Sequence, residues 1–258
     1  MVTQINGSVV KAFDILKLFD EDRNEVTTTD VATELDLNFV TAHRFLRTLE
    51  HVGALVAVAK GRYRLSYVFV DLGDRVTGGD LLGQTLQPLL NAITADLQEA
   101  AMATVFQSDM VVCIARAVSR RQLSVDIRVG SRLEAYCTAH GKTWLAFMSE
   151  RQRAHYLDTV ERLRFTRNTV VERATLERQI AEVRELGHAF NDSEREDGIR
   201  AVAVPILARG GRMIAGLSVF GPASRMTDEI TQLALARLQH AARDAGGLLY
   251  GQIAAPSA

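Results

Sequence analysis

The stretch T-T-T-D-V-A-T-E-L-D-L-N-F-V-T-A-H-R-F-L-R-T-L-E, residues 27–50, predicts two helices joined by a short turn. Thr27 is a favourable N-cap, and Asp30 follows three residues later, near the positive end of the helix. Asp36-Leu37-Asn38 is a tight connector, and Asn38 can cap the second helix. This spacing indicates a helix-turn-helix.

The second of these helices separates an apolar face from an exposed one. Apolar residues at helical spacing are expected to point inward, namely Ala42, Phe45, Leu46 and Leu49. The residues left outside, mostly toward its N-terminal end, are small, apolar or basic: Phe39, Val40, Thr41, His43, Arg44 and Arg47. Such a surface suits the base edges of a DNA major groove.

An ordinary helical hairpin with a solvated basic face has the same spacing, so the next segment decides between the two interpretations. Leu55 to Ala59 is β-prone, Lys60-Gly61 is a turn, and Arg62-Tyr63-Arg64-Leu65 alternates charged and apolar residues. A basic hairpin directly after the second helix is typical of a wing. DNA binding is therefore the favoured interpretation.

The charge of the whole chain does not by itself indicate nucleic-acid binding, because the net charge is −1. The positive charge is local. Between Arg44 and Arg64, five Lys and Arg residues face Glu50 alone. A compact basic patch is typical of a sequence-specific DNA-binding protein, whereas a protein that binds DNA without sequence preference relies on many phosphate contacts.

Composition places the chain among globular proteins, with 47% hydrophobic and 24% charged residues in 258. No apolar run approaches the ~18 residues that a membrane helix needs, and the first residues do not resemble a signal peptide. Two cysteines, Cys113 and Cys137, favour a reducing compartment over a disulfide framework. We therefore expect a cytoplasmic protein with no membrane contact.

Three segments are expected along the chain. Residues 1–66 would form the winged helix-turn-helix, beginning with a helix capped by Ser8. Residues 67–81 would form a linker helix and hinge, because the helical pattern from Tyr67 ends at Thr77-Gly78-Gly79. Residues 82–258 would form the larger domain.

The larger domain reads as α+β, an antiparallel sheet backed by helices. Helical patterns cover residues 82–97, 138–148, 176–186 and 227–250. Strand-like runs cover 101–106, 110–117, 123–129, 201–207 and 213–220, the last two around the turn Arg209-Gly210-Gly211.

The chain also resembles the IclR family of bacterial transcriptional regulators over nearly its whole length. The resemblance rests on S-V-V-K-A-F-D-I-L at residue 8, the segments quoted above, V-G-S-R-L at 129, C-T-A-H-G-K-T-W-L-A-F at 137, F-T-R-N-T-V at 165, E-L-G-H-A-F at 185, E-D-G-I-R-A-V-A-V-P at 196 and L-S-V-F-G-P-A-S-R-M-T at 217. It implies a winged helix, a linker helix and a GAF-like ligand-sensing domain, in a homodimer or a dimer of dimers bound to a double-stranded DNA operator.

The expected DNA contacts follow from the helix, the wing and this resemblance. Base reading is assigned to Thr41, His43 and Arg44, whereas phosphate or minor-groove contacts are assigned to Arg47, Lys60, Arg62 and Arg64. The full set is Thr28, Phe39, Val40, Thr41, His43, Arg44, Arg47, Lys60, Arg62 and Arg64.

The resemblance also implies a small organic acid as effector, bound by Ala139, His140, Asn191, Ile199, Ala201, Ser218 and Phe220. The N–H groups that open the 138–148 helix favour a carboxylate. His140 is either a ligand contact or a capping or core histidine, and Ser218 more often packs within a sheet. Phe220 stands where relatives that bind small oxo-acids have small or polar residues, which favours an aromatic or larger acid.

Rival functions remain open at this stage. Cys137 and His140 are close in sequence, but no catalytic motif accompanies them, so we expect neither an enzyme nor a cofactor. A metal-responsive regulator would use Cys113, Cys137, His140 and His188. Alternatively, the larger domain only oligomerises, in which case Tyr136, Trp144 and Phe220 would fill its core.

Overall fold

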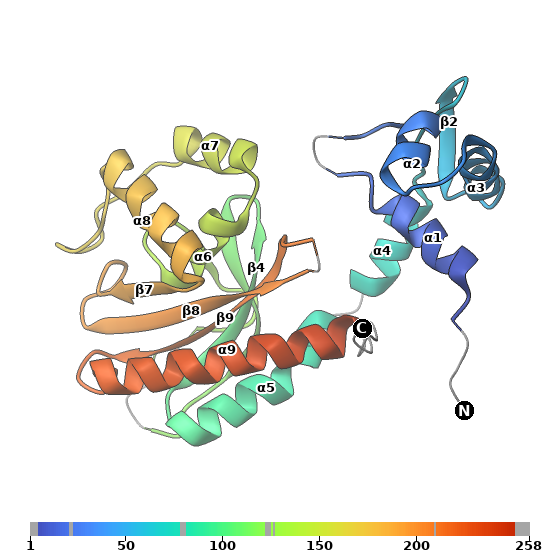
Figure 1. Ribbon diagram of the computed structural model, residues 1–258. Helices are drawn as coiled ribbons and strands as arrows, with labels where there is room; N and C mark the ends of the chain where they lie inside the picture. Colours follow the sequence, from blue (N-terminus) through green and yellow to red (C-terminus); the bar gives the residue numbers. More distant parts are fainter. Residues whose placement is uncertain are drawn as a thin grey trace. The chain divides into compact units, whose positions relative to one another are not determined.

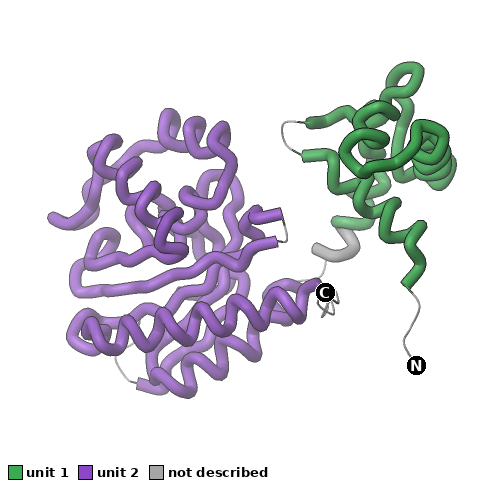
Figure 2. Tube along the Cα trace, in the orientation of Figure 1, with its two compact units in different colours: residues 1–79 green, residues 80–258 purple. Residues whose placement is uncertain are grey.

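The computed structural model describes residues 5–20, 23–77, 81–121, 125, 127–208 and 210–250. The chain divides into two compact units, residues 1–79 (unit 1) and 80–258 (unit 2), which Figure 2 shows in different colours. The expected boundary at Gly78-Gly79 and the turn residue Arg209 lie outside the described residues. Among the described residues, no helix combines the length and apolarity needed to cross a membrane.

Unit 1 is a winged helix-turn-helix followed by one more helix. Its elements are α1 (Gly7–Leu16), β1 (Val26–Thr27), α2 (Thr28–Glu34), α3 (Phe39–His51), β2 (Leu55–Ala59), β3 (Arg62–Leu65) and α4 (Val68–Thr77). The strands form a sheet in the order β1-β3-β2, with antiparallel pairing. Its core consists of Ile15, Val26, Val31, Ala42, Leu46, Leu49, Leu55 and Tyr63.

The turn between α2 and α3 is defined by its capping residues. The Thr27 hydroxyl accepts from the Asp30 N–H at 3.1 Å, and the Asp30 carboxylate accepts from the Thr27 N–H at 2.8 Å. The backbone N–H and the hydroxyl of Thr27 lower the pKa of the Asp30 carboxyl group, and the two bonds complete a capping box. Asp36 adopts φ 48°, and the Asn38 side chain accepts from the Thr41 N–H at 2.8 Å, which starts α3.

The start of α1 differs from the sequence expectation. The N-cap is Asn6, whose side chain accepts from the Ser8 N–H at 3.0 Å, so Ser8 lies inside the helix. Val9, Phe13, Leu16 and Phe19 recur at helical spacing in the sequence, yet Val9 and Phe13 are 54% and 60% accessible and only Ile15 of α1 is buried. Apolar spacing predicted the helix correctly but not which residues the fold covers.

Unit 2 is an α+β domain built on one antiparallel sheet. Its helices are α5 (Leu81–Leu97), α6 (Ala139–Phe147), α7 (Glu150–Thr159), α8 (Arg173–Leu186) and α9 (Asp228–Tyr250). Its strands are β4 (Ala100–Gln107), β5 (Met110–Ala117), β6 (Arg132–Glu134), β7 (Ala189–Asp192), β8 (Ile199–Leu207) and β9 (Met213–Pro222). The strand order is β6-β5-β4-β9-β8-β7.

Helices cover both faces of this sheet, as Figure 1 shows. α6, α7 and α8 lie on one face, over a core that includes Met102, Cys137, Trp144, Tyr156 and Phe220. α5 and α9 lie on the other face, over an apolar core drawn from the opposite sides of the strands. Alternation of side chains along each strand supplies both cores.

Two sequence expectations for unit 2 need correction. The strand expected at 123–129 lies partly outside the described residues, and the described residues among them, 125 and 127–129, are not in a strand. The edge strand is instead β6, which pairs with β5 through Val111 and Leu133. α7 and β7 were not predicted; α7 is too polar to show an apolar stripe, and β7 is only four residues long.

Among the described glycines, Gly141 in α6 leaves the least room for a side chain. A Cβ at this position would lie 2.2 Å from the Cα and the carbonyl oxygen of Ala135. These are backbone atoms and cannot move aside as a flexible side chain would. Only glycine therefore lets α6 pack against the segment that follows β6.

We predict that Gly141→Ala unfolds or severely loosens unit 2, at a cost of at least about 3 kcal/mol, because the added methyl overpacks a backbone contact. The matched control is Gly246→Ala, a helical glycine in α9 with no atom within 4 Å of its Cβ position. The control should hold or raise stability. Thermal unfolding followed by the fluorescence of Trp144, the single tryptophan, measures both; equal melting temperatures would contradict the prediction.

Candidate functional site

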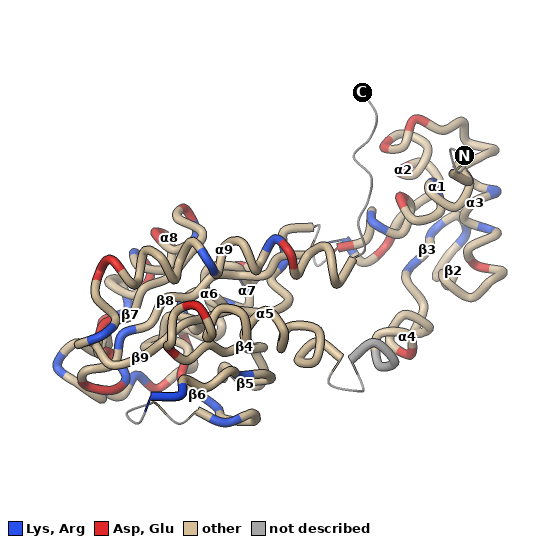
Figure 3. Tube along the Cα trace, turned by 90° about the horizontal axis from the view of Figure 1, so that it is seen from below, with Lys and Arg blue, Asp and Glu red and all other residues tan. Residues whose placement is uncertain are grey.

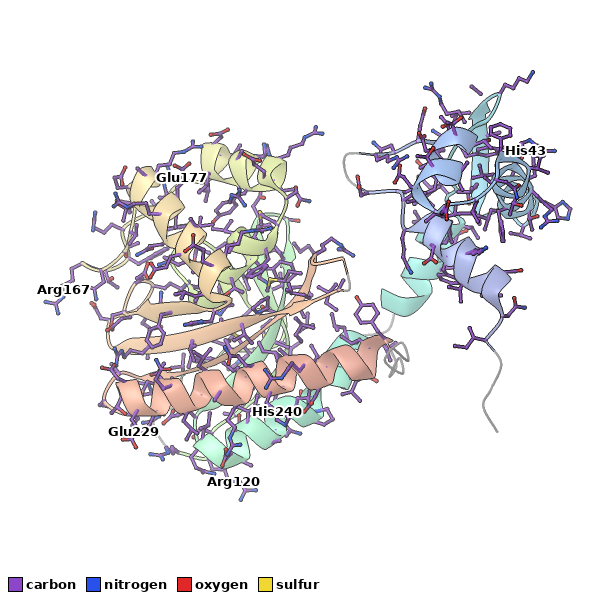
Figure 4. The ribbon with its side chains drawn as sticks, viewed as in Figure 1. His43, Arg120, Arg167, Glu177, Glu229 and His240 are labelled. Carbon is purple, nitrogen blue, oxygen red and sulfur yellow. The ribbon has the colours of Figure 1, made fainter. Side chains whose placement is uncertain are left out.

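Unit 1 presents the outer face of α3. Ala42, Leu46 and Leu49 are buried, whereas Phe39 and Val40 are 58% and 78% exposed. At 3.6 residues per turn, one outward stripe comprises Val40, His43, Arg44 and Arg47. Figure 4 shows His43 on this outward side of α3, and its side chain is exposed.

Basic side chains surround this stripe, and Figure 3 shows Lys and Arg positions along α3 and β3. Arg47 pairs with Glu50 at 2.6 Å, and Arg62 pairs with Glu25 at 3.2 Å. Both pairs are exposed, so each holds its arginine only weakly. Within the described part of the chain, the charged groups of Arg44, Lys60 and Arg64 are not engaged in an ion pair.

Thr28 does not belong to this surface. Its side chain is 3% exposed, and the Cβ position of Gly61 lies 3.8 Å from its hydroxyl oxygen. Its backbone N–H donates to the Gly61 carbonyl at 3.2 Å, which ties the start of α2 to the turn of the wing. The expectation that its side chain contacts DNA is therefore corrected, because packing against the wing covers it.

Unit 2 contains a pocket of about 720 Å³ between the sheet and the N-terminal end of α6. Six of the seven residues expected to bind an effector line it: Ala139, His140, Asn191, Ile199, Ala201 and Phe220. Ser218 does not. Its side chain is fully buried in β9, where the residue pairs with Met102 and Ala203 on the neighbouring strands.

His140 is the most unusual side chain of the pocket. It is 4% exposed, and neither ring nitrogen has a hydrogen-bond partner among the described residues. Burial, together with the positive charge of Arg195, lowers its pKa to about 3. The ring is therefore neutral near pH 7, with one N–H donor and one acceptor nitrogen unused inside the protein. A capping or core histidine with a satisfied backbone contact does not describe it.

The N-terminal end of α6 gives the pocket a positive electrostatic potential that favours anions. Thr138 is the N-cap, but its side chain makes no capping hydrogen bond, because its hydroxyl donates to the Glu134 carbonyl at 2.6 Å. Among the described residues, the first turn of α6 contains no acidic side chain, and its N-cap side chain does not cap it. Backbone N–H groups at such an end bind carboxylates and phosphates.

Sequence reasoning missed the charged residues that line the pocket. These are Arg132 on β6, and the loop residues Arg195, Glu196 and Asp197, which form its charged wall. Arg195 donates to the Glu134 carboxylate at 2.8 Å, and its guanidinium lies 5.3 Å from the ring centre of Phe165. The density of charged residues in the run S-E-R-E-D-G at 193–198 was the available signal. Other residues that line the pocket are apolar and include Met102, Ile127 and Phe220.

Buried polar contacts join α6 to the loop 193–198, which carries the charged wall. Lys142 Nζ lies 2.5 Å from a carboxylate oxygen of Glu194, and the two side chains are 3% and 9% exposed. Asn191 donates to the Cys137 carbonyl at 2.8 Å and accepts from the Glu194 N–H at 3.5 Å. Lys142 is thus structural, and the amide of Asn191 is already engaged with the backbone.

The catalytic and metal-binding interpretations receive no support from this geometry. Burial raises the pKa of Cys113 to about 11 and that of Cys137 to about 12, so neither thiol is a ready nucleophile. Among the described residues, no three His, Cys, Asp or Glu side chains are grouped as metal ligands would be. Tyr136, Trp144 and Phe220 all belong to the core, as the oligomerisation alternative expects, but Phe220 also lines the pocket, so the core does not fill that space.

We predict that Lys142→Met destabilises unit 2 by ~3–5 kcal/mol, because it leaves the Glu194 carboxylate buried without a partner. The double variant Lys142→Met/Glu194→Met should recover most of this loss, since it removes both buried charges. Arg237→Met, which breaks an exposed pair with Asp96, is the control and should cost less than ~1 kcal/mol. Chemical unfolding followed by Trp144 fluorescence measures all three; a double variant no more stable than Lys142→Met would refute this account.

Known proteins share both units. Residues 8–59 match the IclR helix-turn-helix domain, and residues 77–246 match the C-terminal domain of the bacterial transcriptional regulator IclR. The Pca regulon regulatory protein of Pseudomonas putida is 32% identical over 247 residues, which cover 95% of this chain and 84% of that protein. The regulator KdgR of Escherichia coli is 30% identical, over 92% of this chain and 90% of that protein.

Solved structures show the same fold. The IclR protein of Thermotoga maritima has a TM-score of 0.64 at 26% identity, over 95% of this chain and 99% of that chain. The C-terminal domain of E. coli KdgR has a TM-score of 0.60 at 29% identity, over 66% of this chain and 99% of that domain. These relatives are transcriptional regulators rather than enzymes. With both of its units matched, the chain belongs to the IclR family of bacterial DNA-binding transcriptional regulators.

Proposed function

We propose that this regulator binds a specific operator through α3 and the wing, and that a small organic acid in the pocket of unit 2 modulates that binding. The observation that carries the effector proposal is His140, a buried side chain that lines a pocket of about 720 Å³ and whose two ring nitrogens have no hydrogen-bond partner among the described residues. Ligand sites are commonly ~300–1,000 Å³, mostly apolar and fitted with a few polar groups.

The division of labour follows the segments expected from the sequence. Residues 1–66 read DNA, 67–81 link, and 82–258 bind the effector and associate with a second copy. A symmetric dimer would read a near-palindromic operator whose half-sites are about 10 bp apart or a multiple of that. Arg44, His43 and Thr41 read base edges, while Arg47, Lys60, Arg62 and Arg64 contact phosphates or the minor groove.

The polar and apolar residues that line the pocket indicate the class of ligand. A carboxylate would lie at the N-terminal end of α6, where free N–H groups and the helix dipole favour an anion. The remainder of the ligand would contact Met102, Ile127 and Phe220, which form an apolar surface. An aromatic or otherwise larger acid fits this lining better than an acid of two or three carbons.

A solved neighbour suggests a probe compound. An IclR homologue from Microbacterium hydrocarbonoxydans was crystallised with 4-hydroxybenzoate; it shares the fold of this chain at a TM-score of 0.62, with 24% identity. That similarity concerns the fold alone, so 4-hydroxybenzoate enters only as a probe. For the acid to regulate DNA binding, it must bind one arrangement of the dimer more tightly than another, and such couplings are usually ~1–3 kcal/mol.

For DNA reading, we predict that Arg44→Ala loses discrimination between operator and unrelated duplex, whereas Lys60→Ala weakens binding to both about equally. A base contact carries sequence information worth ~1–3 kcal/mol, while a phosphate contact does not. Fluorescence anisotropy with both duplexes at several salt concentrations measures this. Unchanged sequence preference in Arg44→Ala would refute its assignment as a base reader.

For the effector, we predict that aromatic acids such as 4-hydroxybenzoate raise the melting temperature of the protein more than acetate or pyruvate does, because a ligand that binds the folded state stabilises it. Ile199→Trp, which fills the pocket from β8, should abolish the shift. Leu207→Trp, on the same strand but outside the pocket, should retain it. A shift that survives Ile199→Trp would place the ligand elsewhere, and no shift with any acid would leave oligomerisation as the role of unit 2.

A further inference from the structure

The outward face of α3 carries an apolar residue, Val40, in its first turn, where a DNA reader would be expected to carry hydrogen-bonding groups. We propose that Val40 contacts the 5-methyl group of a thymine, so that each operator half-site has a thymine facing the first turn of α3. Phe39 flanks this contact. The inference rests on the proposed role of α3 as the helix that enters the major groove.

The position of Val40 follows from helix geometry. The buried residues of α3 place the inward direction near Ala42, Leu46 and Leu49. With a turn of about 100° per residue, Val40 points almost directly opposite. It is also in the first turn, and in a helix-turn-helix the N-terminal residues of the recognition helix contact base edges. Val40 therefore occupies the place from which a short side chain can touch a base.

Folding of the free protein does not account for a valine here. The side chain is 78% exposed and belongs to no apolar core of the described chain. A β-branched residue is also a poorer helix former than alanine or a long polar residue. The Asn38 cap already stabilises the first turn. A single exposed apolar residue is common, but Phe39 beside it is 58% exposed as well, so the apolar surface covers two adjacent positions.

The charged residues around Phe39 and Val40 indicate what kind of molecule contacts this apolar surface. Arg44 and Arg47 lie one and two turns along the same stripe, and Lys60, Arg62 and Arg64 lie on the wing. This surface is complementary to a polyanion rather than to an ordinary apolar protein partner. The only apolar group that base pairs display in the major groove is the thymine 5-methyl. An apolar side chain within a basic DNA-reading face therefore matches thymine and no other base.

The test removes that methyl alone. Full-length protein first selects its preferred duplex from a random pool, and each thymine is then replaced in turn by deoxyuridine, which keeps every hydrogen-bonding group. We expect this substitution to lower the affinity for DNA about 4-fold at one thymine in each half-site. That is the change expected from losing the burial of roughly one methyl group. Val40→Ala should bind the unmodified duplex more weakly and show no further loss on substitution at that position.

Val52→Ala is the matched control, because Val52 is 64% exposed at the other end of the same helix; it should bind like the unaltered protein and keep the full sensitivity to deoxyuridine. If no deoxyuridine substitution weakens binding, or if Val40→Ala keeps that sensitivity, the thymine contact is refuted while operator binding stands. If the random pool yields no enriched sequence, the proposed operator reading fails, and the thymine contact fails with it.

Discussion

The pocket of unit 2 depends on the buried contact between Lys142 and Glu194. This ion pair joins the helix that forms one end of the pocket to the loop that forms its charged wall, and Asn191 reinforces it through the Cys137 carbonyl. A buried charge pair is not a strong source of net stability, but the loss of one partner is costly. Its effect is therefore to specify one arrangement of α6 and the loop 193–198. Gly141 adds a second constraint, because its missing side chain lets α6 reach the backbone of Ala135.

The two proposed binding surfaces differ in solvent exposure: the charged groups of one are hydrated, whereas the key polar group of the other is buried. The outer face of α3 is exposed, and its basic groups make only weak ion pairs or none within the described chain, so they can exchange water for phosphate at small cost. The pocket instead holds His140 neutral and desolvated, with its ring nitrogens unused. A ligand that supplies hydrogen bonds to those nitrogens would remove an energetic penalty that the free protein carries.

Unit 1 was largely predictable because its signals are local. Thr27, Asp30 and Asn38 start their helices through side-chain bonds to backbone groups within three residues, and such bonds can be recognised in the sequence. The exceptions depend on contacts distant in sequence. Thr28 is buried because the wing folds back over α2, and Val9 and Phe13 remain exposed because no other described part of unit 1 covers them.

By itself, the sequence determined the class of fold, the helix-turn-helix with its wing, and most strands and helices of unit 2, because periodicity and capping act over a few residues. Through family resemblance, it also indicated six residues that line the pocket. Only the tertiary structure decided that Ser218 is packed away and that Arg132 and Arg195 enter the pocket wall. It also decided that Lys142 meets Glu194, 52 residues away. The reason is physical. Which residues share a cavity depends on strand order and helix packing, and the residues next to a side chain in the sequence do not indicate which distant residue it will contact.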